Sequence, residues 1–213
     1  MKTILFQGDS ITDCGWDRKN PTSLGNGYAL FVSAELGHDA PGAYTFYNRG
    51  ISGNRIVDVY ARIKADIINL KPDYMSLLIG VNDVWHEIAH QNGVDAEKFE
   101  KIYTMLLEEV LEALPDIKIM LLAPFVAKGS ATDDTEEKPN RLETFRVEVG
   151  KRVEAVERIG KKFNLPVIHL QEKFDAGIAQ NGDPVYWLRD GVHPTPYGHE
   201  LIAREWINTF KNL

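Results

Sequence analysis

The sequence has little cysteine, no strongly basic segment and no long apolar run. Cys14 is the only cysteine among 213 residues, so no intramolecular disulfide can form, which favours a reducing compartment. The formal net charge is −7, and the basic stripe typical of nucleic-acid-binding proteins is missing. No segment approaches the roughly 18 consecutive apolar residues that a membrane span needs. The sequence therefore predicts no nucleic-acid partner and no insertion into a membrane.

Signals for export and for division into domains are also missing. The apolar run that follows Lys2 is too short for a secretory signal, and no small-residue cleavage site comes after it. We therefore expect a cytoplasmic protein. Without repeats, low-complexity tracts or a Gly/Ser linker, the chain is expected to form a single domain over residues 1–213. The sequence does not determine the oligomeric state, and a homo-oligomer remains open. A polar loop is expected at 128–139, and it could serve as a lid or as a subunit contact.

Short apolar runs alternate along the chain with longer amphipathic segments. Three of the short runs end at a glycine or proline, and all five predict buried strands, at Thr3–Gln7, Tyr44–Tyr47, Tyr74–Ile79, Ile117–Ala123 and Pro166–Leu170. The longer segments carry apolar residues every three or four positions and predict helices at Tyr28–Leu36, Ile56–Leu70, Ala96–Leu114, Arg141–Phe163 and from Pro196 to about Phe210. This alternation predicts an α/β fold, with helices on both faces of a five-stranded parallel sheet.

Four polar blocks stand at the expected strand ends or in the loop before the last helix. They are Gly8–Thr12, Asn48–Asn54, Gly80–Asp83 and Asp190–Pro194. In an open parallel sheet, ligands bind beyond the carboxyl ends of the strands. We therefore expect the four blocks to meet at one site.

Together the blocks contain the parts of a site for acyl transfer. The Ser10 hydroxyl becomes a nucleophile when a base takes its proton, and the His193 imidazole can act as that base near neutral pH. Asp190, three residues earlier, can orient the imidazole. The backbone N–H groups of Ser10 and Gly53 and the side-chain amide of Asn82 are expected to stabilise the oxyanion of the tetrahedral intermediate. Such a mechanism requires no metal and no organic cofactor.

The four blocks resemble those of the SGNH, or GDSL-type, hydrolase family. The residues that give the family its name match Ser10, Gly53, Asn82 and His193, and the resemblance runs over essentially the whole chain. The first block reads Gly-Asp-Ser-Ile where the nominal family motif ends in leucine, which keeps the position apolar. The resemblance implies a flavodoxin-like three-layer α/β/α sandwich with Ser10 as nucleophile, Gly53 and Asn82 as oxyanion donors, and Asp190 and His193 as the other triad members.

Longer strings resemble the bacterial intracellular acetylxylan esterases of this family. They are Gly8–Gly15, Gly80–Trp85 and Trp187–Pro194. The likeness implies a serine ester hydrolase that removes short acyl groups, above all acetyl, from a small or carbohydrate substrate such as an acetylated oligosaccharide. Other family members act on lysophospholipids and thioesters, so a lysophospholipase or thioesterase-type activity remains an alternative. Asp9, Trp85 and Trp187 adjoin the catalytic blocks and are expected to bind substrate, although the two tryptophans also suit an apolar core.

A competing motif stands directly after the third block. The segment His86-Glu87-Ile88-Ala89-His90 matches the His-Glu-x-x-His pattern of zinc hydrolases, in which two histidines on one helix face hold Zn²⁺ and the glutamate acts as base. However, the segment is short, Gly93 follows it, and the serine interpretation already explains the block before it. We therefore expect a polar turn here and no metal site.

Overall fold

A computed structural model describes all residues, 1–213, and contains one five-stranded sheet. The strands are β1 (Lys2–Gly8), β2 (Tyr44–Asn48), β3 (Tyr74–Leu78), β4 (Lys118–Leu122) and β5 (Val167–Ile168). Their order is β2-β1-β3-β4-β5, and every neighbouring pair is parallel. This order is the flavodoxin-like arrangement of a doubly wound sheet. The α/β class and the five parallel strands expected from the sequence are confirmed.

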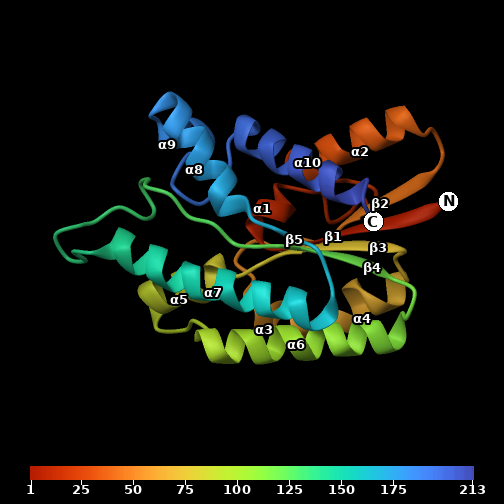
Figure 1. Cartoon of the computed structure of the whole chain (residues 1–213), viewed down its shortest axis with the longest axis horizontal. Helices are drawn as coiled ribbons and strands as arrows, with labels where there is room; N and C mark the ends of the chain where they lie inside the picture. Colours follow the sequence, from red (N-terminus) through yellow and green to blue (C-terminus); the bar gives the residue numbers. More distant parts are fainter.

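Helices cover both faces of the sheet (Figure 1). One layer contains α2 (Tyr28–Asp39), α8 (Leu170–Asn181), α9 (Pro184–Trp187) and α10 (Pro196–Phe210). The opposite layer contains α3 (Ile56–Ala61), α4 (Ile63–Asp66), the short 3₁₀ helix η1 (Ile68–Leu70), α5 (Val81–His90), α6 (Ala96–Ala113) and α7 (Arg141–Phe163). The one-turn helix α1 (Ser10–Asp13) follows β1 directly. None of these helices combines the length and the apolarity needed to cross a bilayer.

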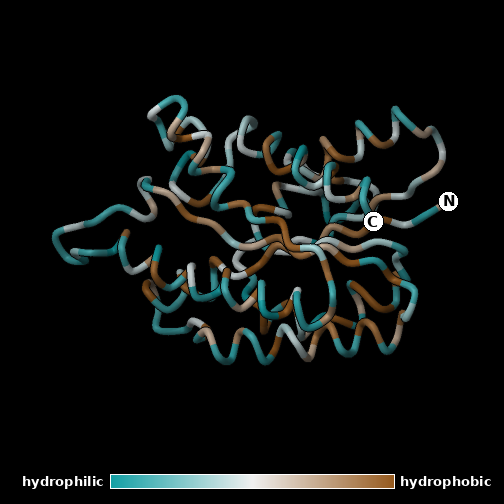
Figure 2. The backbone as a smooth tube through the Cα atoms, in the orientation of Figure 1, coloured by the Kyte–Doolittle hydropathy of each residue, from teal (hydrophilic) through white to brown (hydrophobic).

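Burial on both faces explains why the strands are continuously apolar. Side chains alternate across a strand, so Ile4 and Phe6 enter one core cluster while Leu5 enters the other. Figure 2 shows the hydrophobic strands in the middle of the molecule and hydrophilic residues along the outer faces of the helices. The two clusters hold 26 and 21 buried residues, so neither face of the sheet is left to solvent.

The expected helix over Ile56–Leu70 is wrong in one respect, because the structure breaks it into α3, α4 and η1. The first break is at Arg62, whose backbone leaves helical geometry at φ −113 and ψ 14. The Arg62 guanidinium donates to Asn54 Oδ1 at 2.8 Å and to Gln7 Oε1 at 2.7 Å. The apolar spacing survives the break because Ile56, Val59, Ile63 and Ile67 remain buried.

The polar turn expected at His86–His90 is also wrong, because these residues complete α5. A helical signal was present in the sequence. Val81, Val84, Trp85 and Ile88 have the spacing i, i+3, i+4, i+7 of an amphipathic helix. Gly80 precedes the helix with φ +131, a conformation that disfavours any residue with a side chain. The helix therefore begins immediately after the third strand, with Asn82 in its first turn.

Smaller differences concern element ends. α2 continues through Gly37 to Asp39, and the last strand shrinks to Val167–Ile168 because Leu170 begins α8. The sequence also left α8 and α9 unassigned. The strand order matters more for function, since the chain reverses its winding direction between β1 and β3. This switch point is where open α/β sheets bind ligands, and the first and third polar blocks follow these two strands.

Candidate active site

Ser10 is the first residue of α1, immediately after β1. Asp9 caps this helix, and its Oδ1 accepts a hydrogen bond from the Ile11 backbone N–H at 3.0 Å. Asp9 is fully buried, and burial raises its pKa to about 7. The carboxyl therefore does not line the pocket described below. The expectation that Asp9 contacts substrate gives way to a supporting role beneath the serine.

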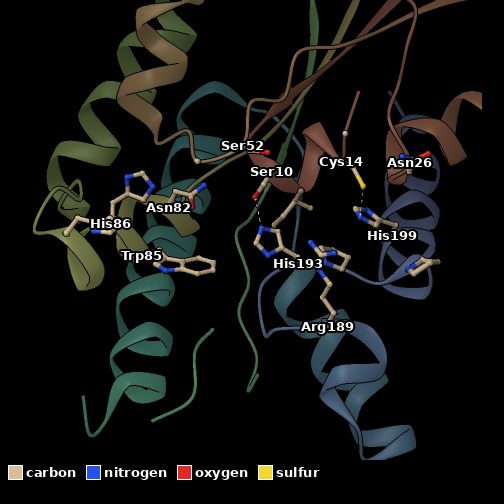
Figure 3. A pocket seen from close by; sticks show the side chains of 16 residues that line it. Ser10, Cys14, Asn26, Ser52, Asn82, Trp85, His86, Arg189, His193 and His199 are labelled. Carbon is tan, nitrogen blue, oxygen red and sulfur yellow. Dashed lines mark hydrogen bonds between the residues drawn. The ribbon is translucent and has the colours of Figure 1, made fainter. Parts of the chain in front are cut away.

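The serine hydroxyl meets the imidazole from the other end of the chain (Figure 3). Ser10 Oγ and His193 Nε2 lie 2.9 Å apart although 183 residues separate them. His193 Nδ1 lies 2.7 Å from Asp190 Oδ2. A carboxylate can only accept here, so the imidazole proton resides on Nδ1, and the Nε2 lone pair faces the Ser10 O–H. The geometry suits transfer of the hydroxyl proton to His193.

Asp190 is held in its ionised form. Partial burial acts to raise the pKa of this carboxyl, but hydrogen bonds outweigh it and lower the pKa to about 2. The donors are the His193 side chain and the backbone N–H groups of His193 and Val192, which lie 2.8 and 3.0 Å from Asp190 Oδ1. Asp190 is therefore a carboxylate throughout the pH range in which an imidazole titrates.

The beginning of the polar loop 128–139 packs against the segment that contains Asp190. The Ala131 N–H donates to the Asp190 carbonyl at 2.9 Å, and the Ala127 N–H donates to the Gly191 carbonyl at 2.8 Å. A Cβ atom on Gly129 would stand 2.2 Å from the Asp190 carbonyl carbon, so only glycine fits. This loop therefore supports the segment that carries Asp190 and His193.

Ser10, Gly53 and Asn82, the three residues expected to donate to an oxyanion, all line the same pocket. The backbone N–H groups of Ser10 and Gly53 donate to no other group of the protein. Gly53 adopts φ +83, the left-handed region that glycine enters without strain. Asn82 Nδ2 lies 3.1 Å from the Asn54 carbonyl and 3.4 Å from Asp9 Oδ2, and these contacts orient its amide. The arrangement offers an anionic oxygen preorganised hydrogen bonds.

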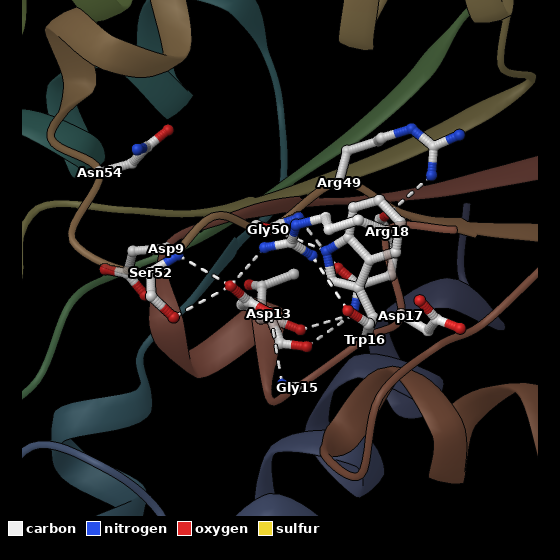
Figure 4. Close-up of polar contacts among 12 residues, drawn as sticks. Asp9, Asp13, Gly15, Trp16, Asp17, Arg18, Arg49, Gly50, Ser52 and Asn54 are labelled. Atoms are coloured by element: carbon white, nitrogen blue, oxygen red, sulfur yellow. Dashed lines mark hydrogen bonds and ion pairs between the residues drawn. The ribbon is translucent and has the colours of Figure 1, made fainter. Parts of the chain in front are cut away.

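Asp13 holds the loop that presents Gly53 (Figure 4). Its Oδ2 accepts from the backbone N–H and the hydroxyl of Ser52, each at 2.9 Å, and from Arg18 Nη2 at 2.6 Å. Asp13 is almost fully buried. Because Ser52 directly precedes Gly53, these bonds fix the Gly53 amide relative to α1.

A pocket of about 700 Å³ opens over these groups. Its lining consists of Ser10, Ile11, Cys14, Gly15, Asn26, Ser52, Gly53, Asn82, Trp85, His86, His90, Arg189, His193, Pro194, Pro196 and His199. Trp85 forms a wall, with its ring centroid 5.9 Å from that of His193. Trp187 lies outside the lining and packs against Gly177, where a Cβ atom would approach its ring to 2.8 Å. The expected substrate contact of Trp187 is therefore replaced by a packing role.

Several pocket residues were not predicted to belong to the site, among them the polar residues Asn26, Ser52, Arg189 and His199. Ser52 lies within the second polar block and Arg189 directly precedes the fourth, which is a usable sequence signal. Asn26 and His199 carry no such signal and enter the pocket only through the packing of α2 against α10. His199 Nδ1 accepts a hydrogen bond from the Tyr28 N–H at 3.2 Å, and its Nε2 lies 3.4 Å from Cys14 Sγ.

The His-Glu-x-x-His segment does not assemble the donor set of a zinc hydrolase. His86 and His90 line the pocket edge with ring centroids 6.1 Å apart. Glu87 turns away, since its Oε2 accepts from the Gly93 N–H at 2.9 Å. No three His, Cys, Asp or Glu side chains of the chain lie together in an arrangement that could hold a metal ion. The two histidines therefore form a polar part of the pocket wall.

Comparisons with known proteins identify the family of this chain. Residues 6–201 match the model of the GDSL-like lipase/acylhydrolase family. The chain is 32% identical to the acetylxylan esterase of Geobacillus stearothermophilus over 96% of this chain and 91% of that protein. Both the family and the esterase fit the resemblance found in the four sequence blocks.

Solved structures share the fold over nearly the whole chain. A GDSL-like lipase from Parabacteroides merdae superposes with a TM-score of 0.90 at 34% identity, covering 99% of this chain and 95% of the other. A crystal structure of an acetylxylan esterase from Geobacillus stearothermophilus superposes with a TM-score of 0.83 at 30% identity, covering 97% of this chain and 93% of the other. The chain therefore belongs to the GDSL-like lipase/acylhydrolase family and is a carboxylic ester hydrolase.

Proposed function

We propose that this protein removes short acyl groups, above all acetyl, from a small or carbohydrate ester through an acyl-enzyme on Ser10. The observation that carries the proposal is the continuous relay from Ser10 Oγ through His193 to Asp190, with contacts of 2.9 and 2.7 Å. The related acetylxylan esterase supports the choice of an acetylated carbohydrate. No step of the mechanism proposed below calls for a metal or an organic cofactor.

The first half of the reaction forms the acyl-enzyme. Ser10 Oγ attacks the ester carbonyl carbon while its proton passes to His193 Nε2. The carbonyl oxygen becomes an oxyanion, which accepts hydrogen bonds from the Ser10 and Gly53 amides and from Asn82 Nδ2. When the tetrahedral intermediate collapses, the bond to the alcohol oxygen breaks, and that oxygen takes the proton from His193.

The second half returns the enzyme to its starting state. Water attacks the acyl carbon while giving one proton to His193 Nε2, and the same oxyanion donors serve again. Collapse then breaks the bond to Ser10 Oγ, which recovers its proton from His193 as the carboxylic acid leaves. Asp190 remains ionised throughout and stabilises the imidazolium in both halves.

The pocket chemistry favours a short acyl group over a lipid chain. Two amides, two hydroxyls and four histidines make up half of the 16 lining residues, and Ile11 and Trp85 are its only large apolar side chains. A long acyl chain would need an apolar channel, because buried alkyl groups gain their binding free energy from apolar contact. Because the pocket has only two large apolar side chains, we rank the lysophospholipase alternative below acetyl-ester hydrolysis.

A panel of p-nitrophenyl esters tests this size selectivity. We expect kcat/KM for the octanoate to be at least about tenfold below that for the acetate. A coupled assay that measures acetate released from an acetylated xylo-oligosaccharide tests directly whether the substrate is a carbohydrate ester. Equal or faster turnover of the octanoate would contradict the proposal, and the Ser10→Ala variant provides the blank for every substrate.

Replacing Asn82 tests the oxyanion site. Asn82→Ala is expected to lower kcat by about 10²–10³-fold with a smaller effect on KM, because one donor is lost where charge develops in the transition state. Steady-state kinetics on p-nitrophenyl acetate measure the effect. Asn208→Ala, an exposed amide on α10, is the matched control. Retention of more than a third of the activity in Asn82→Ala would remove the side chain from the oxyanion site.

A further inference from the structure

The active-site pocket contains no carboxylate, although the chain as a whole is acidic. Its 16 lining residues include one arginine and four histidines but no aspartate and no glutamate. The formal net charge of the chain is −7, so this composition departs from that of the whole molecule. A concave site lined by one sign of charge concentrates its potential on the ligand that enters it.

Arg189 supplies the permanent charge of this pocket. Burial lowers the pKa of His199 to about 4, helped by the charges of Arg189 and His193. Burial and the Arg55 charge likewise lower the pKa of His86. His199 and His86 are therefore neutral at physiological pH. The guanidinium remains charged under all ordinary conditions.

The Arg189 side chain has no partner within the protein. Six other arginines form ion pairs with carboxylates: Arg18, Arg55, Arg62, Arg152, Arg158 and Arg204. Arg189 forms neither an ion pair nor a side-chain hydrogen bond, and the neighbouring Asp190 carboxylate is committed to His193. The backbone of Arg189 is fixed by a hydrogen bond, in which the Arg189 N–H donates to the His193 carbonyl at 3.0 Å. The structure thus anchors the residue and leaves its donors free.

Arg189 lies on the side of the ester where the alcohol leaves. His193 Nε2 must deliver its proton to the alcohol oxygen, so the alcohol portion departs next to His193. Figure 3 shows the Arg189 side chain beside His193 on the side toward His199, whereas Asn82 stands on the opposite side of the Ser10 hydroxyl. The charge therefore faces the alcohol portion, away from the oxyanion donors.

We infer that the preferred substrate is an ester whose alcohol portion carries a carboxylate, and that Arg189 binds this carboxylate in the part of the pocket lined by Asn26 and His199. The inference rests on the proposed ester hydrolysis and adds the charge of the substrate. A guanidinium offers paired N–H donors that match the two oxygens of a carboxylate. A saccharide with a uronic acid residue and an acylated hydroxy acid both present this chemistry.

Two matched substrate pairs test the inference. Methyl tri-O-acetyl-xylopyranoside and methyl tri-O-acetyl-glucopyranosiduronic acid differ only by the carboxylate on C5. The second pair, 4-acetoxybenzamide and 4-acetoxybenzoate, presents the same charge difference without a sugar. For each pair, the ratio of kcat/KM for the anionic ester to that for the neutral ester is measured in the wild type and in Arg189→Gln.

We expect Arg189→Gln to lower this ratio about fivefold in one substrate pair or in both, which is the upper end of the effect of a solvent-accessible charge pair. The change should appear in KM. Added salt should raise KM for the anionic ester in the wild type more than in the variant. Arg146→Gln removes the same charge from an exposed, unpaired arginine outside the pocket and should keep the wild-type ratio. A change in the sugar pair identifies a uronate, and a change in the aryl pair alone identifies another hydroxy acid.

An unchanged ratio in both pairs, with normal turnover of the neutral esters, would overturn this inference and leave the proposed function intact. An equal loss in Arg146→Gln would also overturn it, because the effect would then come from net charge. If the wild type hydrolyses none of the four esters, the proposed function itself fails, and the inference fails with it.

Discussion

Ser10→Ala is expected to lower kcat on p-nitrophenyl acetate by about 10⁴-fold or more, as the loss of the nucleophile does in other serine triads. The variant keeps the oxyanion donors and the pocket, but no acyl-enzyme can form. The hydroxyl makes one hydrogen bond, to His193, and its loss leaves no cavity in the core. The unfolding midpoint in urea should therefore stay close to that of the wild type.

Covalent labelling gives this prediction a second measurement. A fluorophosphonate probe should modify the wild type at Ser10, detected as a mass shift on the peptide that contains it, and should not modify Ser10→Ala. Ser33→Ala, on α2 outside the pocket, serves as the control for loss of a serine hydroxyl. A Ser10→Ala enzyme with a kcat within tenfold of the wild type, or labelled at another serine, would refute the assignment.

Asp190→Asn should have an effect of similar size, a loss in kcat of about 10⁴-fold. Asparagine keeps the shape of the side chain, but its amide can donate to Nδ1 and so hold the imidazole as the wrong tautomer, with a proton on Nε2. It also removes the negative charge that stabilises the imidazolium. Steady-state kinetics measure the loss, and Asp39→Asn, an exposed carboxylate without an ion pair, is the control.

The low pKa of Asp190 also predicts how the activity of the enzyme depends on pH. A carboxyl with its pKa lowered to about 2 in the folded protein stays ionised above that value, and its contribution to stability is lost only as pH falls below about 4 toward 2. Between pH 5 and 9 the activity of the wild type should therefore show no titration of this group. If Asp190→Asn retained at least a tenth of the wild-type kcat across that range, the aspartate would not be part of the triad.

Local sequence patterns predicted most of the fold because its sheet is buried on both faces. Five apolar runs, three of them ending at a glycine or proline, match β1 to β5, and the apolar repeat from Arg141 to Phe163 matches α7 to the residue. The errors occur where a side chain serves a distant partner. Arg62 interrupts the expected helix because its guanidinium bonds to Gln7 and Asn54. The missed helix α5 is an error of interpretation, since its apolar spacing was visible.

The same reasoning explains why the sequence could predict which residues lie together. Ser10, Gly53 and Asn82 each follow one of three neighbouring strands, and the carboxyl ends of parallel strands meet at one edge. Residue type and position after a strand were therefore enough to gather them. Trp187 carried the same signal, as a neighbour of a catalytic block, but its ring packs against Gly177. Proximity in sequence does not determine which way a side chain points.

The sequence by itself determined which reactive groups the chain carries and where its buried strands fall, because a hydroxyl, an imidazole, a carboxylate and the apolar runs between them are properties of residue types and their order. Only the tertiary structure decided how these groups meet: the 2.9 Å contact between Ser10 and His193 closes a separation of 183 residues. It also decided that Arg189 reaches the pocket without a carboxylate partner. These facts depend on how α10 and its preceding loop pack against the sheet, and such long-range packing is the sum of many contacts that no local pattern records.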